Sequence, residues 1–171
     1  MDLMQRRREL LMMGGATPTD NYIYYNVMIY SANTTRAVIS ASIGNVADMW
    51  VDGEQITPTA SMTFAVAGAH PIKVLLNNPA IIPDGMLNAG HYADCVLPAC
   101  VTNIGTNAFR NYASNNATSL LTCLSVTPPA LSGDPFANRH AITVYVPDAS
   151  VAAYQSSWSN MTNIVALSNK Q

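Results

Sequence analysis

The sequence predicts a mainly β protein, in which a small N-terminal β-meander leads into a short solenoid closed by a C-terminal helix and strand. A strand-like motif recurs four times between residues 73 and 146, and aromatic and β-branched residues dominate the segments before it. Helical spacing of apolar residues follows the last repeat. We divide the chain into an N-terminal basic and apolar arm (1–15), a β-rich meander (16–69), repeats (70–147) and a C-terminal cap (148–171).

Each repeat consists of a strand and a return segment. The strands are Lys73–Leu76, Cys95–Pro98, Thr122–Ser125 and Thr143–Val146, and their first residues are 22, 27 and 21 positions apart. The return segments are Ile82–Leu87, Ile104–Phe109 and Leu131–Phe136. Their last residues are 22 and 27 positions apart, the same spacings as between the first three strands. A period of roughly 20 to 29 residues is typical of leucine-rich-repeat solenoids, which mostly present surfaces. Cys95 is the first residue of its strand and Cys123 is the second residue of its strand. Because successive side chains of a strand alternate, we expect these two on opposite faces of the sheet.

Four strands are predicted before the repeats: Tyr22–Tyr30, Ala37–Ile43, Met49–Ile56 and Ser61–Val66. Asp52-Gly53 is a strong signal for a hairpin turn. We expect these strands to form a meander that covers the apolar end of the first repeat, because a solenoid needs a cap.

The C-terminal cap is predicted as a helix over Asp148–Trp158, with Asp148 or Ser150 at its N-cap. Val151, Tyr154 and Trp158 share one helical face, and Ile164–Leu167 offers a closing strand. The 27-residue spacing between the second and third repeat strands is explained by a polar insertion at 111–119. We expect this insertion to be an exposed loop.

The N-terminal arm combines basic and apolar residues at helical spacings before Gly14-Gly15. A helix this short needs a surface to pack on, which could be the same chain or a neighbouring subunit; a solvated leader is the alternative. Its apolar run is too short for an export signal, so we expect none. The residues predicted to anchor the protein in an assembly are Arg6, Arg7, Arg8, Leu10 and Leu11.

The composition favours a protein that assembles with others. Charged residues make up 11 % of the chain, against about 25 % in ordinary domains. Weak repulsion between copies is compatible with a homo-oligomer. A net charge of −2 argues against general nucleic-acid binding, and no run of about 18 apolar residues predicts a membrane span.

The repeats and the cap resemble the BspA-like leucine-rich-repeat family. The segments that carry this resemblance are Val101–Phe109, Val126–Phe136 and Ile142–Tyr154, and it covers about residues 70–167. They are similar in particular to the closing repeats and caps of family proteins from gut bacteria and their phages. The resemblance implies a surface-exposed binding or adhesion module without catalytic activity. The chain departs from the family in its small number of repeats and in the expected lack of an export signal.

The predicted function is that of a non-enzymatic phage virion protein, a fibre or decoration protein attached to the capsid or tail. The arm, which is similar to short leaders of phage open reading frames, would contact the capsid, portal or tail. The body would assemble or bind a host-surface glycan or protein. The alternative is a bacterial cell-surface or secreted BspA-like adhesion protein.

The sequence suggests ligand or interface residues but no catalytic, cofactor or metal site. An aromatic patch for carbohydrate stacking, or alternatively core or subunit contacts, would use Tyr22, Tyr24, Tyr25 and Trp50, and the insertion would add Tyr112, Asn115 and Asn116. The histidines and nearby aspartates show no HxH, HExxH or paired-carboxylate spacing. We therefore expect no enzyme and no cofactor.

Overall fold

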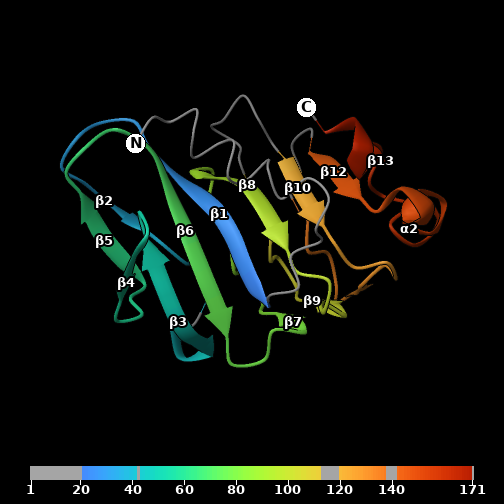
Figure 1. Ribbon diagram of the computed structural model, residues 1–171, viewed down its shortest axis with the longest axis horizontal. Coiled ribbons are helices and arrows are strands. Elements are labelled where there is room, and N and C mark those ends of the chain that lie inside the picture. The colour runs from blue at the N-terminus through green and yellow to red at the C-terminus, as the bar shows by residue number, and fades with distance from the viewer. Residues whose placement is uncertain (1–20, 42, 113–119, 138–141, 171) are drawn as a thin grey trace.

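The computed structural model describes residues 21–41, 43–112, 120–137 and 142–170, and its main feature is one large mixed sheet (Figure 1). The eight strands of this main sheet lie in the order β13-β12-β10-β8-β1-β6-β3-β4. In chain order they are β1 Tyr22–Ile29, β3 Val46–Val51, β4 Glu54–Ile56, β6 Gly68–Leu76, β8 Tyr92–Leu97, β10 Leu120–Cys123, β12 Thr143–Val146 and β13 Ile164–Ala166. The prediction of a mainly β protein is confirmed.

Two smaller sheets and a few short helices complete the described structure. A three-stranded sheet contains β7 Ile81–Ile82, β9 Asn103–Ile104 and β11 Ala130–Leu131, and a two-stranded sheet contains β2 Thr34–Ala37 and β5 Ser61–Phe64. The helices are η1 Ile43–Asn45, η2 Asp148–Ser150, α2 Val151–Ser157 and η3 Leu167–Asn169.

Strand β1 has the side-chain alternation of a strand with one buried face. Its burial alternates strictly from Tyr22 to Ile29, with Ile23, Tyr25 and Val27 fully or almost fully buried. Successive side chains of a strand point to opposite faces, so the intervening residues occupy the other side of the sheet. We call the buried side of the main sheet its inner face and the other side its outer face.

The strand-and-return units stack in sequence order. β8, β10, β12 and β13 are parallel neighbours in the main sheet, and β7, β9 and β11 are parallel neighbours in the small sheet. Successive return segments are joined by backbone bonds from Gly105 N–H to the Ile82 carbonyl, 2.8 Å, and from Ser132 N–H to the Ile104 carbonyl, 2.9 Å. The spacing of the repeats therefore corresponds to a regular stacking of these units.

The anchors of the return segments form a line of buried side chains. Leu87, Phe109 and Phe136 are at most 2 % exposed. The rings of Phe109 and Phe136 are stacked, with centroids 5.6 Å apart and an interplanar angle of 13°, and Trp158 lies 5.6 Å beyond Phe136. Equivalent positions in neighbouring units thus pack directly on one another and continue into the cap.

The predicted meander is wrong in its pairing. β1 does not pair with the next strand along the chain; it lies between β6 and β8 and is antiparallel to both. The first and second repeat strands are therefore not neighbours, and the boundary predicted at residues 69 and 70 falls inside a continuous sheet. Proximity in sequence suggested the meander, but β1 gains hydrogen-bond partners along both edges in its central place.

The strand predicted over 37–43 is also wrong. Val38 and Ile39 are buried, but their backbone leaves the strand after Ala37, and both N–H groups bond to the Ala60 carbonyl. The strand that does form here is β2, which pairs with β5. A buried apolar run needs hydrogen bonds for its backbone, and here turn and loop partners supply them.

The predicted hairpin at Asp52-Gly53 is confirmed. These residues join β3 to β4 and have φ values of 54° and 90°. Positive φ at both central positions characterises the hairpin turn that Asp-Gly favours.

The register predicted for the repeat strands is displaced by one or two residues. Cys95 lies opposite Leu121, and Cys123 lies opposite Leu97, so the two cysteines are two positions apart on the same face. Both are buried, and the prediction of opposite faces is wrong. A displacement of one residue exchanges the faces of every side chain in a strand.

The C-terminal cap forms as predicted, with one difference. Tyr154 and Trp158 are buried, the Trp158 Nε1–H donates to the Pro129 carbonyl at 3.0 Å, and β13 pairs in parallel with β12. Ser150 stands at the N-cap of α2, but its hydroxyl donates to the Val126 carbonyl at 2.8 Å instead of capping the helix. That bond joins the cap to the preceding repeat.

We predict that Phe136→Ala lowers the free energy of unfolding by about 3–5 kcal/mol, because it removes the central ring between Phe109 and Trp158. Urea denaturation followed by circular dichroism measures this change. The matched control is Val126→Ala, whose side chain is 72 % exposed and should change stability by less than about 0.5 kcal/mol. Equal losses in the two variants would contradict the stacked core.

Candidate functional site

The outer face of the main sheet carries one continuous row of residues across all eight strands. The strand registers place these residues side by side, and we call them the outer row: Gln55, Trp50, Lys73, Tyr24, Val96, Thr122, Tyr145 and Val165. Most of them are half-buried, and Lys73 is the single charged member. The row is therefore a broad surface of aromatic, aliphatic and neutral polar side chains.

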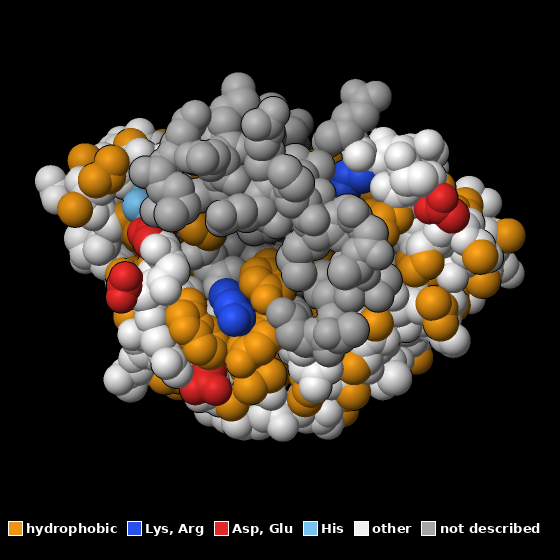
Figure 2. All heavy atoms as spheres, viewed as in Figure 1, with side chains coloured by type: hydrophobic (Ala, Val, Ile, Leu, Met, Phe, Trp, Pro, Cys, Tyr) orange, Lys and Arg blue, Asp and Glu red, His pale blue; other side chains and the backbone are white. Residues whose placement is uncertain are grey.

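Tyr22, Trp50 and Lys73 form an aromatic cluster on this face. The Tyr22 and Trp50 rings meet edge to face, with centroids 5.4 Å apart and an interplanar angle of 82°. The Lys73 Nζ lies 3.9 Å from the Tyr22 centroid and 4.6 Å from the Trp50 centroid. Such a cation–π contact is worth about 0.5–1 kcal/mol at an exposed site. Figure 2 shows a basic side chain enclosed by hydrophobic ones on this side of the molecule.

Lys73 has no ionic partner among the described residues, where the one contact at ion-pair distance between a basic and an acidic side chain joins His70 Nδ1 to Asp52 Oδ2, 2.8 Å. Asp48 lies on the same face as Lys73, opposite Leu75, and its Oδ1 accepts a hydrogen bond from Gln55 at 3.2 Å. Around Tyr22 and Trp50 the face thus presents one ammonium group and one carboxylate, each held in place by neutral neighbours.

A second lysine reaches the outer face at its other end. The Lys170 Nζ donates to Thr122 Oγ1 at 2.8 Å and lies 5.6 Å from the Tyr145 ring centroid. Burial lowers the pKa of Lys170, while the charge of Asp94 acts in the opposite direction. The C-terminal segment therefore places its lysine on the outer face over β10 and β12.

The structure brings three of the predicted ligand residues together. Tyr22, Tyr24 and Trp50 lie half-buried on the outer face. Tyr25 and Tyr112 are instead core residues, 2 % and 1 % exposed, so neither ring is available to a ligand.

The hydroxyl groups of the two buried tyrosines support the fold. The Tyr25 hydroxyl donates to the Val38 carbonyl at 2.5 Å. The Tyr112 hydroxyl accepts the Cys95 N–H and donates to the Leu120 carbonyl, both at 2.7 Å. Burial raises the pKa of both phenols well above the usual range, which keeps them neutral donors.

The remaining predicted residues lie outside the described part of the chain. These are the anchor residues Arg6, Arg7, Arg8, Leu10 and Leu11, and the loop residues Asn115 and Asn116.

The sequence reasoning missed Lys73 and Asp48 as functional candidates. Lys73 interrupts an apolar strand at a position whose neighbours Ile72 and Val74 are buried, so period-two alternation could have placed it on the outer face. Its position between Tyr22 and Trp50 required the pairing of β6 with β1 and β3, which the predicted meander did not contain.

The described residues offer few candidates for other kinds of functional site. No group of three His, Cys, Asp or Glu residues there could hold a metal ion. The described histidines bond to different partners: His70 bonds to Asp52 and the Val66 carbonyl, and His91 bonds to the Ala37 carbonyl. None of the described helices is long and apolar enough to cross a membrane.

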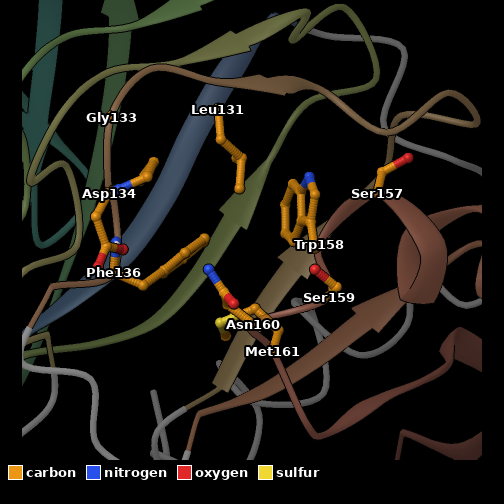
Figure 3. A pocket seen from close by; sticks show the side chains of 10 residues that line it. Leu131, Gly133, Asp134, Phe136, Ser157, Trp158, Ser159, Asn160 and Met161 are labelled. Carbon is orange, nitrogen blue, oxygen red and sulfur yellow. The ribbon is translucent and has the colours of Figure 1, made fainter.

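A small hollow lies where the third return segment meets the end of α2. Its volume is about 130 Å³, and Figure 3 shows Phe136, Trp158 and Asn160 among the side chains that line it. Ligand pockets usually measure roughly 300–1,000 Å³. Because the two rings are almost fully buried, this hollow offers little surface to a ligand.

Comparison of the chain with protein-family models, with curated proteins and with solved structures found no match in any of the three sets.

We predict that Cys100 is the thiol that reacts with Ellman's reagent in the folded protein at pH 8. Cys95 and Cys123 are buried, and burial raises their pKa values, so little thiolate forms and reagent cannot reach it. Burial also raises the pKa of the partly exposed Cys100, so its reaction should accelerate as the pH rises. Absorbance should report one thiol per native chain and three in denaturant. Loss of the reaction in Cys100→Ser identifies the thiol, and rapid reaction of all three would contradict the buried arrangement.

Proposed function

We propose that this chain is a non-enzymatic structural protein of a phage virion, a fibre or decoration protein on the capsid or tail. Its body would be a short leucine-rich-repeat unit of the BspA-like type, joined to the strands that precede it. The expected role is assembly or binding to a host surface.

The main support for this proposal is the outer face of the main sheet. The outer row crosses the whole main sheet, consists mostly of half-buried aromatic and aliphatic residues and includes a single charge, Lys73. Aromatic residues are enriched at protein interfaces, where charged residues are depleted in the central region. A broad and nearly neutral sheet surface is suited to contact with another macromolecule more than to chemistry in a closed pocket.

The stacked units support the choice of a repeat protein. Parallel strands recur in the main sheet, and return segments pack through Phe109 and Phe136. Each unit contacts mainly its neighbours, as in repeat proteins that present extended surfaces. In the proposed arrangement the N-terminal arm contacts the capsid, portal or tail, while the sheet remains available for other contacts.

We predict that the protein co-purifies with phage particles. Antibodies against the chain would be applied to gradient-purified particles and to the cell envelope from one culture. A constant amount per particle is the expected result. A chain found in the envelope and absent from particles would favour the bacterial surface adhesion protein instead.

A deletion variant then tests the arm. A chain lacking residues 1–15 should be lost from the particles because it lacks the proposed contact with the capsid, portal or tail. Circular dichroism checks that the variant folds, and Val126→Ala, at a side chain that is 72 % exposed, serves as a full-length control with an intact arm. Particles that retain the deletion variant at the wild-type level would overturn the anchoring role.

A further inference from the structure

We propose that the outer face of the main sheet docks on the same face of a second copy of this chain, across a two-fold axis that exchanges Lys73 and Asp48. This inference rests on the proposed function as an assembling structural protein and names the partner of its outer face.

The positions of the two charges fit a symmetric contact. Asp48 lies opposite Leu75, two residues along β6 from Lys73, so the two side chains are diagonal neighbours about 7–8 Å apart. In a two-fold interface, if one residue contacts a second residue of the other copy, the reciprocal contact also forms. An axis in the plane of the interface and midway between the two residues would place each Lys73 over the Asp48 of the other copy.

Within one chain the two groups do not pair. The Lys73 ammonium group is held over the Tyr22 and Trp50 rings, and the Asp48 carboxylate accepts a hydrogen bond from Gln55. Both charges are thus positioned on the outer face, and neither forms an ion pair with another described residue. A facing copy supplies one opposite charge for each of them.

The half-buried residues near Lys73 and Asp48 suit such a contact. They are Tyr22 and Tyr24 on β1, Trp50 on β3 and Leu75 on β6. Packing of one sheet on another is a common way to bury half-exposed aromatic and aliphatic side chains.

A second copy fits the cluster better than a stacked sugar does. A saccharide ring stacks on an aromatic face, and the Lys73 ammonium group already occupies one face of both Tyr22 and Trp50. A carboxylate approaching from outside can meet this ammonium group without displacing it from the rings. The geometry therefore favours a partner that brings a carboxylate at a fixed position, as Asp48 of a second copy does.

Charge exchange tests this inference by sedimentation velocity of the full chain. The wild type should be a dimer, while Lys73→Asp and Asp48→Lys should each raise the dimer dissociation constant at least tenfold, because each variant places like charges in contact. An equimolar mixture of the two variants should dimerise again, since the reversed charges meet each other and the native Lys73 meets the native Asp48. The double variant should also recover the dimer.

The control variant is Glu54→Lys, which reverses an exposed charge on the same hairpin. Glu54 lies opposite Val51 and so belongs to the other face of the sheet. It should leave the dimer unchanged, and circular dichroism should show that every variant folds.

Three results would overturn the inference. These are a monomeric wild type, single variants that dimerise as well as the wild type, and a mixture that does not recover. A monomer that binds an immobilised acidic polysaccharide through Lys73 would assign the face to a saccharide instead. If the protein is a monomer that still joins phage particles, the dimer inference fails and the proposed function stands. If the protein forms a dimer that responds to the charge exchanges as expected but is absent from particles, the proposed function fails and the dimer inference stands.

Discussion

The hydrogen bonding of β1 along both of its edges is the interaction on which the rest of the sheet depends. Its partners are β6 on one side and β8 on the other, so one strand joins the antiparallel part of the sheet to the parallel repeat strands. Buried backbone groups must be paired, and removal of β1 would leave two unpaired edges in the middle of the molecule. The same strand contributes Ile23 and Val27 to the core and Tyr22 to the outer face.

The division between the two faces explains how a weakly charged chain can form a core and keep an interaction surface. Return segments and the cap bury the inner face through Phe109, Phe136 and Trp158. The outer face carries aromatic and aliphatic residues too, but its cations at Lys73 and Lys170 lie near aromatic rings. Lysine stems can pack on apolar neighbours while the ammonium groups find polar partners, as the Lys170 Nζ does at Thr122 Oγ1, so this face keeps a polar character.

Local patterns predicted most of the elements, and long-range pairing accounts for what they missed. The spacing of Phe109 and Phe136 located the return segments, Asp52-Gly53 located a hairpin, and Tyr154 with Trp158 located the capping helix. No local pattern states which strands become neighbours, so the place of β1, the Cys95 register and the Lys73 cluster were not predictable. Val38 and Ile39 were mistaken for a strand because burial alone does not distinguish strand from coil.

The central place of β1 also has a consequence for biosynthesis. A ribosome releases Tyr22–Ile29 before its first partner, which is Gly68–Leu76, and well before its second, Tyr92–Leu97. During that interval an apolar strand has both edges free, a state prone to pairing with other chains. Sheets built from such distant contacts also close slowly, because each contact requires a long loop to be ordered first. Early protection of this segment during synthesis would therefore matter more for the yield of folded protein than protection of any later strand.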